Sequence, residues 1–328
     1  MKEINKAIVA IDFPETEVDE MVRLINAATV IRCSASDSDT IRANLKDAEI
    51  AILGKGLSGL VENLGPDMRW IHCDAAGLDF LFRPALADRE EICVTCSSGR
   101  SSKALSEHVI MFMLALNYQV NNIWESRKRR EYSMPFLSTA KALFGQSAGI
   151  LGCGSIAREL APRLKALGMN TIGFAKSTTE LNGMDKIYHE EEGLRELLTA
   201  SDFIISTVAL TDETYHLLNE ERLSLLKPTS YVVNISRGSI IDEPALIKCL
   251  REGKIAGAGL DTFEQEPLGK ESPLWTLPNV VMTPHFTPPQ PDKHEVSLKV
   301  ILDNIRNYRN EEPLRNVYKS YYRFSGKK

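Results

Sequence analysis

Three polar residues in the second half of the chain each follow a strand-like apolar run. Arg237 lies in NISRG, Glu266 in LDTFEQEP and His285 in TPH. The carboxyl ends of parallel strands meet at one edge of a sheet, where ligands bind. We therefore expect the loops after these strands to converge on one crevice.

These three side chains together suit the reduction of a 2-keto acid by hydride. Arg237 offers a fork of N–H donors to a carboxylate and a polarised carbonyl. His285 can donate a proton to the carbonyl oxygen as hydride reaches the carbon, and can take it back in the reverse direction. Glu266, if hydrogen-bonded to the imidazole, would favour its charged form and fix its tautomer. No metal is required.

Each residue also has an ordinary structural interpretation. Arg237 could form a surface ion pair, Glu266 could be a solvated loop acid, and His285 could be a turn residue beside Pro284. Their order along the chain, after the glycine-rich stretch of residues 152–157, favours catalysis. His216, in TDETYHLLNEERL, follows a turn and precedes a helix start, so we assign it a structural or peripheral cofactor role.

The stretch SAGILGCGSIARELAPRLKALGMNTIGFAKS has the pattern of a nucleotide-binding βαβ unit. Gly152 permits a tight turn, Gly154 lets the backbone approach a pyrophosphate, and Ala157 lets the helix pack close to the strand. The helix should end at Gly168, and its N-terminal N–H groups should face an anion. The apolar face of this helix should consist of Ile156, Leu160, Leu164 and Leu167. The alternative is a tight turn without a ligand, which the flanking strand and helix disfavour.

Composition excludes several other classes of protein. The 328 residues are 43% hydrophobic and 25% charged, which is typical of folded domains and long enough for two of them. A net charge of -5 disfavours nucleic acid and anionic membranes as partners. The N-terminus enters a strand-like run at once, unlike a signal peptide. The apolar run 109–116 is too short to span a bilayer, so we expect it to be a buried helix.

Six cysteines are scattered along the chain without a disulfide framework, which indicates reduced thiols in a cytoplasmic enzyme. Cys93 and Cys96 have CxxC spacing, but no second pair follows at a spacing typical of zinc sites. We therefore expect them to be buried strand residues. The basic run 127–130 has no interleaved aromatic residues, so we expect a solvated helix face or a subunit contact.

Short apolar runs alternate with helical patterns along both halves of the chain, which predicts parallel sheets with helices on both faces. The predicted strands are Ala7–Ile11, Thr29–Ile31, Ile50–Leu53, Trp70–His72, Cys93–Thr95, Ala148–Leu151, Asn170–Phe174, Phe203–Thr207, Tyr231–Ser236, Ala256–Asp261 and Val280–Thr283. The longest helical pattern, Ser101–Asn122, should be buried nearly all round and lead into the second domain. His108 within it should be a satisfied core histidine. A final helix, Asp292–Asn310, should return to the first domain.

Ala76 and Gly77, in AAGLD, follow a predicted strand of the first domain. Their backbone N–H groups could bind a carboxylate at the end of the sheet, or the segment could be a plain turn. The residues leave both interpretations open.

At this point the chain resembles the D-isomer-specific 2-hydroxyacid dehydrogenases, the group that contains phosphoglycerate dehydrogenase and the glyoxylate/hydroxypyruvate reductases. The segments that carry the resemblance are WIHCDAAGLDFL, GRSSKALSEHVIMFMLAL, GILGCGSIARELAPRLKALGM, NISRGSIIDEPALIKCLREGKIAGAGLDTFEQEPL and SPLWTLPNVVMTPH, with the closing helix. They span essentially the whole chain.

The resemblance implies an α/β fold of two doubly wound parallel-sheet domains with a cleft between them. Residues 101–291 would form a Rossmann-type dinucleotide-binding domain, and residues 1–100 and 292–328 a flavodoxin-like substrate-binding domain. It also implies domain closure over the substrate and a homodimer through helices around residues 101–144.

The resemblance also implies site residues. Arg237, Glu266 and His285 would be catalytic, Asp261 would meet the nicotinamide amide, and Ala76 and Gly77, with Arg237, would bind the substrate. The residues expected at the cofactor are Gly152, Cys153, Gly154, Ser155, Ile156, Ala175, Lys176, Ser177, Thr178, Thr207, Val208, Ala209, Ile235, Ser236, Asp261 and His285.

The chain departs from the family pattern in three places. Members that prefer NAD carry an acid where this chain has Ala175, followed by Lys176 and two hydroxyl residues. Lys176 would attract a 2′-phosphate, so we expect NADP to be preferred over NAD. The prolines of residues 286–291 replace small residues and glycine, which indicates an unusual pocket. Ala209 replaces a common proline, a tolerable change.

We therefore expect an NAD(P)-dependent reductase of small 2-keto acids, with no nucleic-acid or membrane partner. The alternative is a non-catalytic, corepressor-like NAD(P) sensor on the same fold, which could retain the catalytic residues. The glycine loop alone would also fit a methyltransferase, which the later basic and acidic groups disfavour. Loops 54–60 and 286–291 would set the pocket size, and the sequence does not name the acid.

Overall fold

The computed structural model describes residues 1–54, 61–78, 86, 89–132 and 139–318. The chain forms two compact units, Met1–Ser101 with Gln290–Lys328 (unit 1) and Ser102–Pro289 (unit 2). The expectations for loop residues 55–60, for residues 133–138 of the dimer region, for residues 79–81 of the first resemblance segment and for the tail beyond residue 318 lie outside the described residues.

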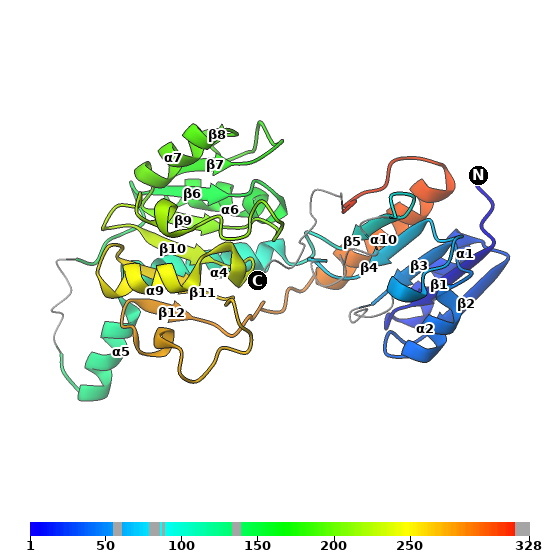
Figure 1. The fold of residues 1–328 in the computed structure, drawn as a ribbon, viewed down its shortest axis with the longest axis horizontal. Helices are drawn as coiled ribbons and strands as arrows, with labels where there is room; N and C mark the ends of the chain where they lie inside the picture. The colour runs from blue at the N-terminus through cyan, green and yellow to red at the C-terminus, as the bar shows by residue number, and fades with distance from the viewer. Residues whose placement is uncertain (55–60, 79–85, 87–88, 133–138, 319–328) are drawn as a thin grey trace. The chain divides into compact units, whose positions relative to one another are not determined.

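Unit 1 is a five-stranded parallel sheet in the order β2-β1-β3-β4-β5, which is the flavodoxin-like order (Figure 1). Its strands are β1 (Lys6–Ala10), β2 (Thr29–Cys33), β3 (Ile50–Leu53), β4 (Trp70–Cys73) and β5 (Cys93–Cys96). Among the described residues its helices are α1 (Glu15–Ile25), α2 (Ser38–Leu45) and α10 (Lys293–Arg309), with the short 3₁₀ turn η1 (Val61–Asn63).

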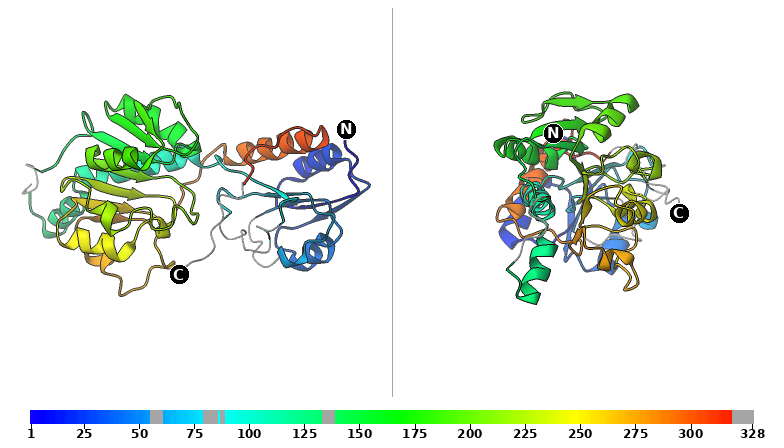
Figure 2. Two further views of the ribbon diagram at one scale, coloured as in Figure 1. Left: turned by 45° about the horizontal axis from the view of Figure 1, so that its top comes forward. Right: turned by 90° about the vertical axis from the view of Figure 1, so that its left-hand side faces the viewer.

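Side chains of β1 alternate between two cores because successive strand residues point to opposite faces. Ile8 and Ala10 pack with α2 on one face. Ala7 and Val9 pack on the other face with α1 and α10, which lie side by side in Figure 2. Helix α10 therefore contributes to the core of unit 1.

Unit 2 is a seven-stranded parallel sheet in the order β12-β11-β10-β9-β6-β7-β8 (Figure 1). Its strands are β6 (Ser147–Leu151), β7 (Asn170–Phe174), β8 (Lys186–Tyr188), β9 (Phe203–Ser206), β10 (Tyr231–Asn234), β11 (Gly257–Leu260) and β12 (Val280–Met282). Its helices are α4 (Ser102–Asn117), α5 (Val120–Arg129), α6 (Ser155–Ala166), α7 (Glu191–Ala200), α8 (Glu220–Leu223) and α9 (Glu243–Arg251), with 3₁₀ turns η2 (Gly238–Ile240) and η3 (Pro273–Thr276).

The strand order of unit 2 reverses direction at β6 and β9, as in Rossmann folds. Helices α4 and α6 share one hydrophobic core with these strands. On the other face α7 approaches β6 so closely that a Cβ on Gly149 would lie 2.5 Å from Leu197. The prediction of two doubly wound α/β parallel-sheet domains is confirmed.

The predicted helix Ser101–Asn122 is wrong in its length. The structure ends α4 at Asn117 and starts α5 at Val120, because Gln119 adopts the left-handed region with φ 52°. The bend follows no glycine or proline, so the apolar pattern did not reveal it. Burial nearly all round is also wrong, since Met111 and Leu114 are 40% and 39% exposed.

Two further details differ from expectation in the βαβ unit and beyond it. Leu167 is not on the buried face of α6; it is the C-cap residue and 39% exposed, whereas Leu160 and Leu164 are fully buried. Gly168 ends the helix with φ +74°, as predicted. The edge strand β8 was not predicted, because its three residues KIY are too short to show a period.

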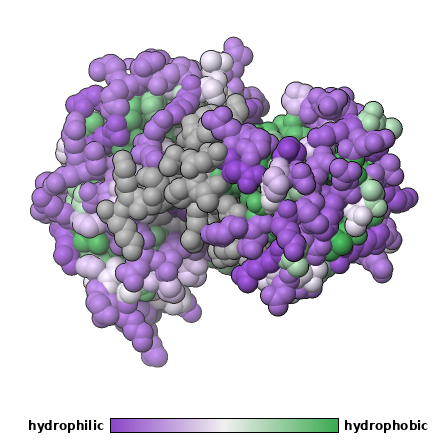
Figure 3. Space-filling view, turned by 45° about the vertical axis from the view of Figure 1, so that its right-hand side comes forward, coloured by the Kyte–Doolittle hydropathy of each residue, from purple (hydrophilic) through white to green (hydrophobic). Residues whose placement is uncertain are grey.

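The six cysteines are free thiols. Cys96 lies buried in β5, as predicted, whereas the prediction that Cys93 is buried is wrong, because this first residue of the strand is only half-buried. Burial raises the pKa of Cys96 to about 11, and the same cause raises the pKa of Cys153 to about 11. Among the described residues no helix is long and apolar enough to cross a membrane. Figure 3 shows one face of the molecule, which is mainly hydrophilic with scattered hydrophobic patches.

His72 of β4 is fully buried beside β5. Its ring nitrogens lie 2.9 Å from Thr95 Oγ1 and 3.2 Å from Ser97 Oγ. Burial lowers the pKa of His72 to about 4, below the ordinary value of about 6.5. Between these two pH values the unfolded chain binds a proton that the folded chain does not, so stability falls as pH falls through that window.

We predict that acidification from pH 7 to 4.5 costs about 2 to 3 kcal/mol through His72 alone. His72→Gln should lose this part of the pH dependence in urea unfolding, while His189→Gln, at an exposed histidine, should keep it. Equal pH dependence in the wild type and His72→Gln would contradict the assignment.

Candidate active site

His285 and Glu266 form a hydrogen-bonded pair after strands β12 and β11. His285 Nδ1 lies 2.6 Å from Glu266 Oε2. Because a carboxylate only accepts, Nδ1 carries the proton, which leaves Nε2 as the other reactive nitrogen. Glu266 Oε1 accepts a second hydrogen bond from the Phe263 N–H at 3.0 Å. The two side chains are 44% and 35% exposed, so the pair is partly accessible to solvent.

The backbone of His285 is held in an unusual conformation with φ 50°, a region that side chains with a Cβ rarely adopt. Its N–H donates to the Asp261 carbonyl at 2.8 Å, and the next N–H, of Phe286, donates to Asp261 Oδ1 at 2.8 Å. Asp261 is therefore the anchor of the turn that presents the imidazole.

Arg237 follows β10 and is the N-cap residue of the turn η2. Its Nη1 donates to the Ser236 carbonyl at 2.8 Å. The buried Asn234 shapes this turn, because its Nδ2 donates to the Arg237 carbonyl at 2.9 Å and its Oδ1 accepts from Ser236. A Cβ on Gly238 would lie 1.8 Å from the carbonyl carbon of Phe263, so the Arg237 turn packs directly on the segment before Glu266.

The glycine turn after β6 has the backbone expected for a phosphate site. Gly152 has φ +94°, and a Cβ there would lie 2.9 Å from Val208. Gly154 is the N-cap of α6, has no side-chain cap, and has open space where a Cβ would stand. A diphosphate needs both features, namely uncapped N–H groups and room beside them.

The side chain of Cys153 points away from this open space, since a Cβ on Gly173 of β7 would lie 2.6 Å from its sulfur. Ile156 packs on the core of unit 2, and Ser155 begins α6. Of these three residues, we therefore expect the backbone of Cys153 and Ser155 to face a ligand and the side chain of Ile156 to serve packing.

Residues after β9 and β10 complete the other side of the turn. Thr207 Oγ1 donates to the Gly152 carbonyl at 2.7 Å, and the Ala209 carbonyl accepts from Thr214 at 2.6 Å. Ser236 Oγ lies 2.6 Å from Ser206 Oγ, and Ile235 is buried in the core. These predicted cofactor residues thus lie at the carboxyl ends of β6, β9 and β10, and the others follow β7, β11 and β12.

Ala175 follows β7 and partly packs on the core. The Lys176 ammonium forms an ion pair with Glu213, which comes from the segment after β9. Thr178 Oγ1 donates to the Cys153 carbonyl at 3.4 Å, which attaches this segment to the glycine turn. The structure also places His189, which the sequence analysis did not name, beside this segment: its Nδ1 lies 2.7 Å from the Ala175 carbonyl oxygen. His189 follows β8, the strand that was not predicted.

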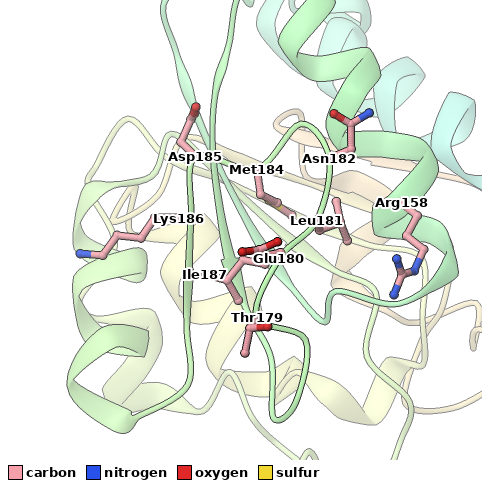
Figure 4. Close-up of a pocket in the computed structure, with 9 residues that line it drawn as sticks. All are labelled: Arg158, Thr179, Glu180, Leu181, Asn182, Met184, Asp185, Lys186 and Ile187. Carbon is pink, nitrogen blue, oxygen red and sulfur yellow. The ribbon is translucent and has the colours of Figure 1, made fainter.

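A cavity of about 570 Å³ lies beside this segment. In Figure 4 Arg158, from the first turn of α6, lies across it from Lys186 and Ile187 of β8. The complete lining is Arg158, Thr179, Glu180, Leu181, Asn182, Met184, Asp185, Lys186 and Ile187.

Ala76 and Gly77 follow β4 in unit 1. Ala76 is exposed and Gly77 is half-buried. The neighbouring Asp74 forms an ion pair with Arg100 at 2.5 Å and accepts from Ser297 of α10 at 2.7 Å. Burial alone would raise the pKa of Asp74, but Arg100, Ser97 and Ser297 outweigh it and hold that pKa below the usual value. The segment before Ala76 is therefore anchored at the carboxyl edge of the sheet.

Two histidines outside the predicted catalytic set have defined partners. His216 Nε2 lies 2.6 Å from Glu264 Oε1, which joins the segment after β9 to the segment before Glu266. His108 is buried, as expected, and its Nε2 lies 3.0 Å from Thr283 Oγ1. The expectation that both ring nitrogens of His108 are hydrogen-bonded is wrong, because its Nδ1 has no hydrogen-bond partner among the described residues. The sequence analysis assigned no site role to Asn234 and Thr283, although they lie in the motifs NISRG and TPH.

The chain matches the family model described as D-isomer specific 2-hydroxyacid dehydrogenase, NAD binding domain, over residues 110–287. A glyoxylate reductase from Pyrococcus furiosus is 34% identical over 274 residues, which is 81% of this chain and 80% of that protein.

Two solved structures are similar over nearly the whole chain. A D-isomer specific 2-hydroxyacid dehydrogenase from Xanthobacter autotrophicus Py2, in complex with NADPH and MES, has a TM-score of 0.78 and 25% identity, covering 97% of this chain and 99% of that one. An NADPH-dependent glyoxylate/hydroxypyruvate reductase from Sinorhizobium meliloti, with NADP and sulfate, has a TM-score of 0.77 and 26% identity, covering 96% and 98%. With the matched model and the 34% identical relative, these similarities mean that the chain belongs to the D-isomer-specific 2-hydroxyacid dehydrogenase family.

Proposed function

We propose that this protein is a reductase that transfers hydride from a nicotinamide cofactor to a small 2-keto acid and forms the D-2-hydroxy acid. The observation that carries this proposal is the His285–Glu266 hydrogen bond at 2.6 Å, at the same sheet edge as the uncapped glycine turn. Family membership makes the protein an oxidoreductase with a nicotinamide-binding unit, and the glyoxylate reductases among its relatives suggest the acid class.

Each polar group at this edge has a proposed task. The N–H groups of α6 around Gly154 hold the diphosphate, and Asp261 accepts from the nicotinamide amide. When bound, the nicotinamide ring supplies the hydride. The Arg237 guanidinium binds the substrate carboxylate and polarises its carbonyl. Charged His285 gives its Nε2 proton to the carbonyl oxygen, and the Glu266 carboxylate stabilises the imidazolium through Nδ1.

The assignment of the two units to substrate and cofactor is part of the same proposal. Unit 2 carries the glycine turn and the His285–Glu266 pair, so we assign the cofactor to it. Ala76 and Gly77 of unit 1 would bind the substrate carboxylate through their backbone N–H groups. A homodimer through α4 and α5 is supported by exposed apolar side chains on both helices, among them Met111, Leu114 and Trp124.

We propose that NADP is preferred over NAD. Ala175 offers no carboxylate to a ribose hydroxyl or against a 2′-phosphate, and Lys176 stands next to it with Ser177 and Thr178. The two structural relatives above were solved with NADPH or NADP. Glu213 opposes this preference, because it forms an ion pair with Lys176 and places a negative charge where the 2′-phosphate would bind.

The alternative, a non-catalytic NAD(P) sensor, is not favoured by the comparisons, since the relatives are named as enzymes. Purified protein, NADPH and a panel of glyoxylate, hydroxypyruvate, pyruvate and bulkier 2-keto acids separate the two. Reduction of none of these acids, with nucleotide binding intact, would leave the sensor as the better account.

We predict that His285→Gln lowers kcat by about 10²- to 10⁴-fold, because the proton donor is lost. Glu266→Gln should lower kcat less, because the imidazolium loses its carboxylate partner at Nδ1. The measurement is the steady-state rate of 2-keto acid reduction from pH 5 to 9. His294→Gln, at a histidine that pairs with Glu17 in unit 1, is the control. Wild-type kcat in His285→Gln would exclude the proposed role.

We also predict that Lys176→Ala raises KM for NADPH by about tenfold, equal to about 1.4 kcal/mol, with little change for NADH. Glu213→Gln should lower KM for NADPH, because the carboxylate of Glu213 then no longer competes for Lys176. The measurement is kcat/KM with each nucleotide at fixed keto acid. A strong wild-type preference for NADH, or equal losses with both nucleotides in Lys176→Ala, would refute the NADP assignment.

A further inference from the structure

Thr283, directly after β12, lies between two buried titratable side chains from different elements. Its Oγ1 donates to Asp261 Oδ1 at 2.5 Å and lies 3.0 Å from Nε2 of His108 in α4. Asp261 is 1% exposed and His108 is 4% exposed. A continuous hydrogen-bonded chain therefore runs from the long helix α4 to the carboxylate that anchors the His285 turn.

The direction of these hydrogen bonds follows from the number of protons available. The threonine hydroxyl has one proton and gives it to the carboxylate, so it must accept from His108. His108 thus carries a proton on Nε2, while its Nδ1 has no hydrogen-bond partner among the described residues. Burying a ring nitrogen without a partner costs free energy. His108 also packs against the Phe112 ring, with ring centroids 4.8 Å apart, but an apolar side chain could make that contact equally well. The feature of His108 that matters for the site is therefore its Nε2–H donor.

Asp261 passes this constraint on to the catalytic turn. The same Oδ1 that accepts from Thr283 also accepts from the Phe286 N–H at 2.8 Å, and the Asp261 carbonyl accepts from the His285 N–H at 2.8 Å. His285 holds φ 50° between these two hydrogen bonds. Such a conformation persists only where the surroundings fix it. A rotation of the Asp261 carboxylate would therefore break the Phe286 hydrogen bond, one of the two that hold the turn carrying the imidazole.

We propose that His108 and Thr283 are positioning residues of the reaction, which orient the ionised Asp261 carboxylate and through it fix both the nicotinamide contact and the His285 turn. This inference rests on the proposed function, because it takes Asp261 as the acceptor of the nicotinamide amide. Neither residue touches the reacting atoms. Substitution of either residue should therefore change the affinity for the cofactor more than it changes kcat.

The charges around Asp261 agree with this role. Burial raises the pKa of Asp261, while the hydrogen bonds from Thr283 and Phe286 and the charges of His108 and His285 lower it. Burial lowers the pKa of His108, and the Asp261 carboxylate and the Phe286 backbone oppose that shift. Removing the Thr283 hydroxyl removes a group that stabilises the ionised carboxylate. Cofactor binding should then weaken at a higher pH than in the wild type, because Asp261 becomes protonated earlier as the pH falls.

The test compares Thr283→Val, which keeps shape but loses the hydroxyl, with Thr283→Ser, which keeps the hydroxyl. Dissociation constants for NADPH and NADH are measured by titrating the protein without keto acid, from pH 5 to 8. Thr283→Val should raise the dissociation constant about tenfold and move its acid limb to higher pH, and Thr283→Ser should stay within threefold of the wild type. His108→Phe should change it in the same direction. Thr199→Val is the matched control, since Thr199 is an exposed residue of α7 bonded to the Arg195 carbonyl.

Thermal unfolding of the apoprotein separates positioning from folding. Equal nucleotide affinity in the wild type, Thr283→Val and His108→Phe would overturn the inference, as would losses in Thr283→Val and Thr283→Ser that follow their unfolding temperatures alone. Failure of the wild type to reduce any 2-keto acid would count against the proposed function instead. The nucleotide titrations would still decide whether this network holds Asp261.

Discussion

Parallel pairing between neighbouring strands is the constraint on which the candidate site depends. Because β6, β9, β10, β11 and β12 all run in one direction, their carboxyl ends share one edge of the seven-stranded sheet. Residues separated by more than a hundred positions, such as Gly152 and His285, thereby reach one edge. The reversal of strand order at β6 and β9 leaves open the space over Gly154, where a switch point receives its ligand.

On this edge, hydrogen bonds between two buried side chains and the backbone set the geometry of the turns. Asn234 shapes the Arg237 turn, and Asp261 holds the His285 turn through two N–H donors. The pairing of His285 with Glu266 is then a consequence of where these turns leave the sheet. Preorganised groups of this kind need little rearrangement when charge develops in a reaction.

The alternating pattern of apolar runs and helices was enough to predict both sheets, because buried parallel strands are short and hydrophobic. The motifs around Gly154, Arg237, Glu266 and His285 pointed to one edge for the same reason. The break at Gln119 escaped prediction, since no residue there disfavours a helix by itself. The contact between His108 and Thr283 escaped prediction, because it joins α4 to a residue 175 positions away. Periodicity within one segment carries no information about such a pair.

The position of Cys153 beneath the glycine turn has a practical consequence. Its sulfur packs against Gly173, and burial keeps its thiol protonated at neutral pH, so an alkylating reagent can reach it only when this part of unit 2 opens. The rate of alkylation at this cysteine therefore reports local opening at the glycine turn, where we propose that the dinucleotide binds, and protection by a nucleotide would be readable on an intact protein by mass spectrometry.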